Sequence, residues 1–358
     1  MFELNAKVKN LTPYDPIEGQ YPIRLDANES FVTLSKEMKA EIAAEITNTH
    51  FNRYPDPYAN EVRAGFAKYF GVPKECVMAG SGSDEVISVL MNAFLQKGDT
   101  VVTVSPDFSM YAFYAALVEC KVVTVQKKKD YTIDVDLLIE TANREHARLI
   151  VFSNPCNPTG RVLKKEAVRR LITSVKSLVV LDEAYMDFSD QSLLSEFSQY
   201  DNLLILKTCS KAIGMASVRL GFAVGQERFI RVLQAVKSPY NLNTLTQTVG
   251  TVIFSHPEYI RAALQRILES RDELYRALLK IEEEFPKDFH PIPTDANFVY
   301  VECKDAAGIF EYLKEKGIVV RKMGDCLRIT AGKHYENETV VAEITAYLKG
   351  ESVCEQQV

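Results

Sequence analysis

The feature that most constrains the fold is an alternation of helical segments with short apolar runs between residues 60 and 225. Two helical segments are NEVRAGFAKYF (60–70) and SDEVISVLMNAFLQKGD (83–99), and the second begins with acidic residues, as the helix dipole favours. The apolar runs are TVVTV (100–104), KVVTV (121–125), RLIVFSN (148–154), SLVVLDE (177–183), NLLILKT (202–208) and RLGFAVG (219–225). Runs that are apolar on both faces and separated by helices predict an α/β fold whose mainly parallel sheet is covered by helices.

A second, smaller unit is expected after this region, because 358 residues are more than one compact core usually holds. Residues 226–286 are mostly helical in pattern, and two strands with a helix between them follow, DANFVYVEC (295–303) and DCLRITAG (325–332). The predicted division is an N-terminal segment that packs on the small domain, a large domain and a small α+β domain, with the bounds 1–45, 46–245 and 246–358.

Composition excludes several classes of function. The formal net charge of −6 argues against a binder of nucleic acid or of anionic membranes, and KKK at 127–129 fits a solvated turn. The seven cysteines and five histidines are scattered without C-x-x-C or other ligand spacing, which predicts a reducing cytoplasmic setting, no disulfide framework and no metal site. We expect no signal peptide and no membrane-spanning segment, because no apolar run approaches 18 residues.

Polar residues gather where the apolar runs end. In an open parallel sheet, ligands bind beyond the carboxyl ends of the strands. The segments at those ends are GSGSDE (80–85), SPDF (105–108), SNPCNPTG (153–160), DEAY (182–185) and TCSK (208–211). We therefore expect these five segments to converge on one crevice.

Most of these residues allow both a structural and a functional interpretation. Ser83 or Asp84 could simply cap a helix, or the backbone around them could bind an anion at the helix N-terminus. Asp182 could be a cap or a salt-bridged acid, or it could pair with a protonated ring nitrogen, and Tyr185 could be packing alone. Turn chemistry explains most of NPCNPTG, although Asn157 could also donate to a ligand oxygen.

Lys211 is the sharpest candidate, because it lies among small and apolar residues that suit a solvated cation poorly. A lysine in a pocket can attack a carbonyl to form a Schiff base, and Arg219, eight residues later, fits a bidentate phosphate ligand. Thr208 and Ser210 add hydroxyl donors. These residues together match pyridoxal 5′-phosphate (PLP). They offer an amine for its aldehyde, a carboxylate for its pyridinium, an aromatic ring and donors for its phosphate.

The same motifs resemble those of the class I/II aminotransferases of PLP fold type I, most closely the histidinol-phosphate aminotransferases. The resemblance runs through nearly the whole chain in order. Its motifs are NLTPYDP (10–16), LDANES (25–30), NRYPDP (52–57), GSGSDE, PDFSMY (106–111), NPCNPTG, DEAY, SKA, SPYNLN (238–243), ANFVYV (296–301) and CLRITAG (326–332). Departures are a missing Pro-Gly turn after LDANES, a short KMGDCL segment and Ser-Val before Arg219 where Gly-Leu is usual.

The resemblance implies a role for each matching residue around the cofactor. Lys211 would form the internal aldimine and then shuttle a proton, while Asp182 would keep the pyridine nitrogen protonated. Tyr185 and Asn157 would hydrogen-bond the phenolic oxygen, and Phe108 would stack on the ring. The phosphate would be held by Ser83, Asp84, Thr208, Ser210 and Arg219, and by Tyr54 of a second subunit, which implies a homodimer with shared sites.

For the substrate, the resemblance implies Arg328 as the anion-binding arginine, with Tyr14, Asn157 and Arg321 as further contacts. The implied activity is ping-pong transfer of an amino group from L-histidinol phosphate to 2-oxoglutarate, which yields L-glutamate. An aromatic amino-acid aminotransferase or a threonine-phosphate decarboxylase of the same fold is the alternative, and a non-catalytic phosphate-binding α/β module is a third reading.

Overall fold

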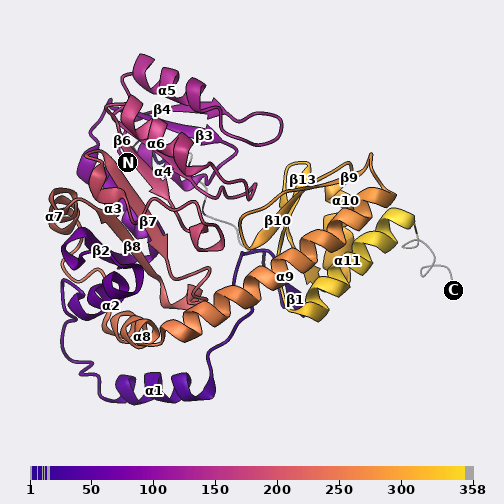
Figure 1. Ribbon diagram of the computed structural model, residues 1–358, viewed down its shortest axis with the longest axis horizontal. Helices are drawn as coiled ribbons and strands as arrows, with labels where there is room; N and C mark the ends of the chain where they lie inside the picture. Colours follow the sequence, from indigo (N-terminus) through magenta and orange to yellow (C-terminus); the bar gives the residue numbers. More distant parts are fainter. Residues whose placement is uncertain (1, 6, 10, 12, 14–16, 351–358) are drawn as a thin grey trace.

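A seven-stranded sheet organises the larger part of the molecule (Figure 1). The computed structural model describes residues 2–5, 7–9, 11, 13 and 17–350. Across the sheet the strands run in the order β2-β8-β7-β6-β5-β3-β4. Their bounds are β2 (Val77–Ser81), β3 (Thr100–Ser105), β4 (Lys121–Gln126), β5 (Leu149–Ser153), β6 (Leu178–Asp182), β7 (Leu203–Thr208) and β8 (Leu220–Gly225). The predicted α/β class with a mainly parallel sheet is confirmed.

The exception is β8, which runs antiparallel to both β2 and β7. A parallel pair needs a crossover connection, usually a helix, whereas the chain between β7 and β8 is a loop with one 3₁₀ turn (Ala216–Val218). The chain therefore turns back at the edge where β7 ends. This return is the stretch that contains Lys211 and Arg219.

Helices cover both faces of the large sheet, and alternate residues of each strand pack against them. One face packs on α3, α4 and α7, and the other on α2, α5, α6 and α8. The bounds are α2 (Asn60–Phe70), α3 (Gly82–Phe94), α4 (Met110–Leu117), α5 (Val135–Arg144), α6 (Lys165–Ser174), α7 (Glu227–Val236) and α8 (Thr244–Ser255). On β6, for example, Val179 and Leu181 belong to one cluster and Val180 to the other, so both faces are buried.

The helix expected over 60–70 forms with those bounds, but the helix expected over 83–99 ends at Phe94. Strand β2 was not predicted, because VMAGS is short and ends in small residues. It forms as the edge strand of the sheet, paired with β8 over five positions.

The smaller unit is a four-stranded antiparallel sheet with the order β12-β13-β10-β9, covered by three helices. The long helix α9 runs from the large unit to this one (Figure 1). The bounds are α9 (Pro257–Glu284), β9 (Phe289–Ile292), β10 (Phe298–Cys303), α10 (Ala306–Glu315), β11 (Ile318–Val319), β12 (Arg321–Met323), β13 (Cys326–Thr330) and α11 (His334–Lys349).

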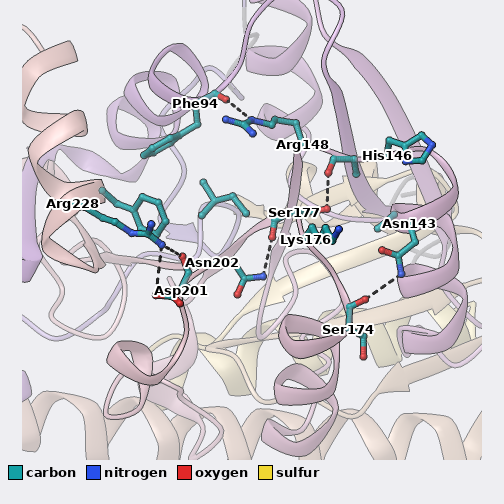
Figure 2. A pocket seen from close by; sticks show the side chains of 14 residues that line it. Phe94, Asn143, His146, Arg148, Ser174, Lys176, Ser177, Asp201, Asn202 and Arg228 are labelled. Atoms are coloured by element: carbon teal, nitrogen blue, oxygen red, sulfur yellow. Dashed lines mark hydrogen bonds and ion pairs between the residues drawn. The ribbon is translucent and has the colours of Figure 1, made fainter.

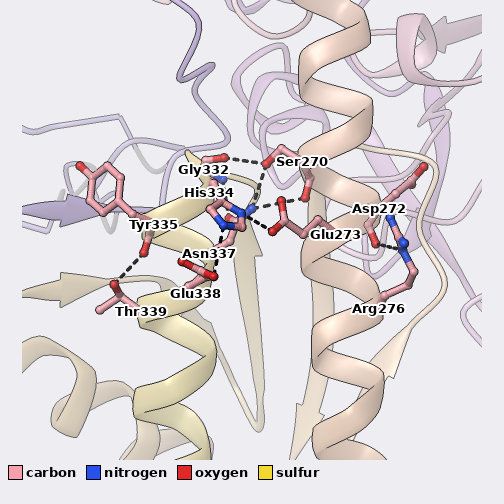
Figure 3. A network of polar contacts seen from close by, with 10 residues as sticks. All are labelled: Ser270, Asp272, Glu273, Arg276, Gly332, His334, Tyr335, Asn337, Glu338 and Thr339. Carbon is pink, nitrogen blue, oxygen red and sulfur yellow. Dashed lines mark hydrogen bonds and ion pairs between the residues drawn. The ribbon is translucent and has the colours of Figure 1, made fainter.

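Buried polar contacts fix the turn that follows β13 to α9 (Figure 3). Ser270 Oγ of α9 donates to the Gly332 carbonyl over 2.6 Å, and Asn337 Nδ2 of α11 donates to Ser270 Oγ over 2.9 Å. Asn337 Oδ1 in turn accepts from the Gly332 amide over 2.9 Å. These contacts hold the end of β13, the strand that carries Arg328, against the helix that joins the two units.

The N-terminal segment contacts both units. Strand β1 (Ile23–Arg24) pairs with β11 in the small unit, whereas α1 (Lys36–Thr47) packs on α8 of the large one. The domain bounds given above remain a prediction. In the described part of the chain, no helix is long and apolar enough to cross a bilayer.

Candidate active site

A cavity of about 560 Å³ lies at the carboxyl ends of the parallel strands. The order β5-β3-β4 places a topological switch point between β3 and β5, which is where open α/β sheets bind ligands. Of the predicted site residues that the structure describes, the cavity brings together all except Tyr54. It is lined by Ser83, Asp84, Phe108, Asn157, Asp182, Tyr185, Thr208, Ser210, Lys211, Arg219, Arg321 and Arg328, among others. The five polar strand ends therefore meet, together with residues of the small unit.

Asp182, the last residue of β6, presents a buried carboxylate to the cavity. Its Oδ2 accepts a 2.7 Å hydrogen bond from the Tyr111 hydroxyl, and its Oδ1 accepts from the Ala184 amide over 3.0 Å. Burial raises the pKa of Asp182 to about 6, against the lowering effect of these two donors. The site thus contains a desolvated, oriented carboxylate that a cation would stabilise in its charged form.

Asp107, in the loop after β3, is a second carboxyl group at this cavity and is half-buried. Burial raises the pKa of Asp107 to about 6, and the charge of Lys127 opposes that shift. It accepts hydrogen bonds from the Phe108 amide over 2.7 Å and from the hydroxyl of Ser153 at the end of β5. Asp107 therefore ties together the two strand ends at the switch point and fixes the backbone that carries Phe108.

Lys211 faces the ring of Tyr185, with its Nζ 5.9 Å from the ring centroid. The ammonium group donates to the Ala27 carbonyl over 3.0 Å. The Tyr185 hydroxyl accepts a 2.9 Å hydrogen bond from Asn28 Nδ2. Because that bond uses a lone pair of the hydroxyl oxygen, the Tyr185 O–H can still donate to a ligand. The amine and the phenol are thus held on the same side of the cavity.

Close backbone packing shapes the part of the cavity at the start of α3. A Cβ on Gly221 would lie 2.5 Å from the Gly82 carbonyl carbon and from the Ser83 amide nitrogen, and a Cβ on Gly82 would lie 2.7 Å from Arg219 Nη2. Arg219 itself has a φ of 54°, in the left-handed region that is uncommon for a residue with a side chain. Its Nη2 lies 3.3 Å from Asp84 Oδ2.

The same corner has the donors that a phosphate needs. The N-cap of α3 makes no side-chain capping bond, which leaves amides of its first turn available to an anion. The hydroxyls of Thr208 and Ser210 lie 3.0 Å apart at the end of β7. Arg219 lies over the start of α3, so the guanidinium, the amides and the hydroxyls can serve one phosphate group.

Arg328 reaches the cavity from β13 of the small unit and is buried. Its Nη1 donates to Asn157 Oδ1 over 2.6 Å, and its Nη2 donates to the Asp26 carbonyl over 2.7 Å. The amide nitrogen of Asn157 is thereby left to donate to a ligand. Arg321 of β12 pairs with Arg328 across the sheet, so the small unit presents two guanidinium groups.

One predicted residue of the described chain lies elsewhere. Tyr54 is 79% exposed and stacks on Tyr240, with the ring centroids 4.4 Å apart. Tyr14 lies outside the described residues.

The sequence interpretation did not assign three residues that this geometry brings forward, namely Tyr111, Asp107 and Asn28. Tyr111 and Asp107 stand in PDFSMY and Asn28 in LDANES, so both motifs held the signal. The motifs could not show which residue each side chain contacts, because Tyr111 reaches Asp182 and Asn28 reaches Tyr185 only in the folded chain.

The residues present fit PLP. The structure supplies an oriented carboxylate that a pyridinium would stabilise, an amine across the cavity and a glycine-lined corner with anion donors. Among the described residues, no cluster of His, Cys, Asp and Glu side chains suits a metal ion.

Both the fold and this site are those of an aminotransferase. Residues 21–344 match the family model for aminotransferase class I and II, and the chain belongs to that family. A curated relative, the histidinol-phosphate aminotransferase of Clostridium kluyveri, is 38% identical over 347 residues, covering 96% of this chain and 97% of the relative.

Solved structures show the same fold. The histidinol-phosphate aminotransferase from Sinorhizobium meliloti, solved in complex with pyridoxal-5′-phosphate, aligns with a TM-score of 0.86 and 22% identity over 97% of this chain and 99% of that one. The L-threonine-O-3-phosphate decarboxylase from Porphyromonas gingivalis aligns with a TM-score of 0.79 and 19% identity over 91% of this chain and 99% of that one. At these identities, the structural likeness speaks for the fold alone.

Proposed function

We propose that the chain is a PLP-dependent aminotransferase that moves an amino group from L-histidinol phosphate to 2-oxoglutarate. The observation that carries this proposal is that Lys211 and Asp182 reach one cavity from the ends of two neighbouring strands, with Arg219 at the corner that suits a phosphate. The curated relative that covers nearly the whole chain bears the name of this activity.

In this proposal Asp182 pairs with the ring nitrogen of PLP, and Arg219, Thr208, Ser210 and the first amides of α3 hold its phosphate. When bound, PLP supplies an aldehyde that condenses with amines and a ring that withdraws electrons from the carbon beside the captured nitrogen. The Asp182 carboxylate keeps its charge opposite the ring nitrogen because the Tyr111 hydroxyl and the Ala184 amide both donate to this carboxylate. Phe108, next to the anchored Asp107, supplies an aromatic face.

Lys211 is the group that carries a proton to and from the substrate carbon in this assignment. Its Nζ is positioned by the Ala27 carbonyl, and the neutral amine is a competent base once a substrate amine has taken its place. Tyr185 and Asn157 donate to the oxygen of the cofactor ring. Both side chains are oriented by their other contacts, Tyr185 by Asn28 and Asn157 by Arg328.

Arg328 and Arg321 bind the anionic end of the substrates, and Tyr14 remains a further candidate. A guanidinium pairs in the same way with a carboxylate and with a phosphate, so Arg328 can receive both glutamate and a phosphorylated amine. The guanidinium of Arg328 is oriented toward the cavity by its bonds to the Asp26 carbonyl and to Asn157 Oδ1.

The test is incubation of the PLP-loaded protein with L-histidinol phosphate and 2-oxoglutarate, with glutamate as the measured product. Aromatic amino acids and threonine phosphate run in parallel as donors. Release of CO₂ from threonine phosphate without formation of glutamate would show that the protein is a decarboxylase instead. A preference for aromatic donors would show that it is an aromatic amino-acid aminotransferase.

The proposal extends to a cytoplasmic homodimer in which Tyr54 contacts the phosphate bound by the other subunit. Support comes from the exposure of Tyr54, which is absent from the lining of the cavity in its own chain. The cytoplasmic part of the proposal is supported by the six described cysteines, which are free thiols. Light scattering should give a dimer mass, and Tyr54→Phe should weaken PLP retention without dissociating the dimer.

A further inference from the structure

One face of the small sheet carries three pairs of side chains that do not belong to the core of the small unit. On β10 and β13 alternate residues, such as Val301 and Leu327, pack into that core, so the residues between them point the other way. Across the two strands these residues pair as Phe298 with Thr330, Tyr300 with Arg328, and Glu302 with Cys326. Arg328 therefore stands in the middle pair.

The first two pairs contact the large unit at the candidate active site. The Phe298 ring lies edge to face against Tyr185, with the ring centroids 5.3 Å apart. In the middle pair, Arg328 donates to Asn157 Oδ1 over 2.6 Å. This face of the small sheet is thus the one that meets the large unit.

The third pair contacts the large unit through Tyr131, which lies in the loop between β4 and α5. The Tyr131 hydroxyl donates to Glu302 Oε1 over 2.5 Å. Its ring lies edge to face against Tyr300, with the ring centroids 5.5 Å apart. Because Tyr300 is the cross-strand neighbour of Arg328, Tyr131 contacts the small sheet on the two positions next to this arginine.

Local hydrogen bonds shape the loop so that it presents Tyr131. The Lys128 amide donates to the Thr132 carbonyl and the Tyr131 amide donates to the Lys128 carbonyl, both over 2.9 Å. Asp130 Oδ1 accepts from the Thr132 amide over 3.1 Å and from its hydroxyl over 2.6 Å. Tyr131 has a φ of 62°, in the left-handed region that is uncommon for a bulky residue and that the surrounding contacts must stabilise.

The beginning of the same loop is attached to the active-site segment after β3. Lys127 Nζ donates to the Pro106 carbonyl over 2.8 Å, and Pro106 precedes Asp107 and Phe108. Lys127 is therefore half-buried, whereas the two lysines that follow it are exposed as the sequence predicted. The loop thus joins the segment that carries Phe108 to the strand beside Arg328.

A hollow of about 770 Å³ at the amino ends of β5, β6 and β7 shows a different use of polar side chains (Figure 2). The residues that line it belong to the large unit. Asn143 Nδ2 donates to the Ser174 carbonyl over 3.1 Å, and Asn202 Nδ2 donates to the Ser177 carbonyl over 3.0 Å. These bonds join segments of one unit, so they have no influence on the position of Arg328.

We propose that Tyr131 is a positioning residue for Arg328. The inference rests on the proposed function, in which Arg328 binds the anionic end of the substrates. The Tyr131–Glu302 bond fixes β10 against the large unit, and β10 sets the position of β13 through their paired backbones. Without this bond the small sheet would also populate positions in which Arg328 is displaced from the anion, and the apparent affinity for the anion would fall accordingly.

The test is calorimetric titration of the PLP-loaded protein with glutarate, which has the two carboxylates of 2-oxoglutarate but no oxo group to react. Tyr131→Phe keeps the ring and deletes the hydroxyl, and Glu302→Ala deletes the acceptor. Each should weaken glutarate binding about threefold to tenfold, the effect of one partly exposed hydrogen bond. The KM for 2-oxoglutarate should rise by the same factor, whereas kcat and PLP affinity should stay within about twofold, because the lost contact serves ground state and transition state alike.

Three further variants separate positioning from a general loss of stability. Tyr312→Phe is the matched control, because it removes a tyrosine–glutamate bond of 2.8 Å, to Glu343, that lies within the small unit. This control should bind glutarate like the wild type. The double variant Tyr131→Phe, Glu302→Ala should bind no more weakly than either single variant, because both changes remove one contact. Glu302→Gln should keep most of the affinity, because its amide oxygen can still accept the bond.

Unchanged glutarate binding by Tyr131→Phe would overturn the proposal, and so would equal weakening by Tyr312→Phe or a loss of PLP affinity in Tyr131→Phe. Arg328→Gln distinguishes a failure of this inference from a failure of the proposed function. Loss of glutarate binding in Arg328→Gln together with normal binding in Tyr131→Phe would refute the positioning role alone. Normal binding in Arg328→Gln would refute both the role of Arg328 and the inference that rests on it.

Discussion

Removal of the Tyr111 hydroxyl should change the protonation of Asp182 and, through it, the affinity for PLP. Tyr111 is fully buried on α4, and its hydroxyl donates to Asp182 Oδ2 over 2.7 Å. Tyr111→Phe deletes this donor and leaves the ring in place. The carboxylate would then retain the Ala184 amide as its donor within the chain.

The magnitude follows from the burial of this pair. A hydrogen bond to a charged, buried group contributes about 1.5–3 kcal/mol, and a loss of about 1.4 kcal/mol from the charged form raises a pKa by about one pH unit. The pKa of Asp182, about 6 in the native protein, should therefore rise to about 7 or higher in the variant. A protonated carboxyl group cannot pair with a pyridinium. As the pH is lowered, PLP affinity should therefore begin to fall at a higher pH in Tyr111→Phe than in the wild type.

The assay is a spectrophotometric titration of apoprotein with PLP at a series of pH values from about 5.5 to about 8.5, a range that spans both pKa values. The pH midpoint of the affinity should move upward by about one pH unit in Tyr111→Phe. Tyr114→Phe is the matched control on the same helix, because among the described residues its hydroxyl makes no hydrogen bond to Asp182, and the carboxylate whose charge acts on it is Asp84. Coincident midpoints for Tyr111→Phe and the wild type would refute the reasoning.

Three further outcomes are expected. Lys211→Ala should bind PLP and show no turnover, and near-normal glutamate formation by this variant would contradict the role given to Lys211. Gly221→Ala should lower the melting temperature and weaken PLP retention, because its Cβ would meet the Gly82 and Ser83 backbone at 2.5 Å, whereas Gly71→Ala, whose Cβ meets nothing within 4 Å, should retain PLP normally. The apoprotein should lose stability as pH rises from about 4 to about 6, by about 2–3 kcal/mol from Asp182, because a pKa raised to about 6 means that the folded state holds the proton more tightly than the unfolded chain. Urea unfolding measures this slope, which Asp182→Asn should reduce, and an unchanged slope in that variant would assign it to other groups such as Asp107.

The local parts of the fold were predictable because they depend on short-range patterns. The apolar runs became strands of one sheet, and NEVRAGFAKYF became α2, because spacing along the chain sets which face of an element is apolar. Strand β2 and the direction of β8 were not predictable in this way. Strand β2 depends on pairing with β8 between residues more than 130 positions apart, such as Ser81 with Leu220, and the direction of β8 depends on the loop that returns the chain beside β7.

The sequence by itself determined the α/β class, the polar strand ends and the identity of the groups that could hold PLP. These follow from composition and order, which are properties of the chain as written. Only the tertiary structure decided the orientation of those groups. Tyr111 meets Asp182 across 71 positions and Asn157 meets Arg328 across 171, because sheet order and the packing of the small unit bring them together. A protonation state or a free donor depends on such contacts and on burial, which a motif does not specify.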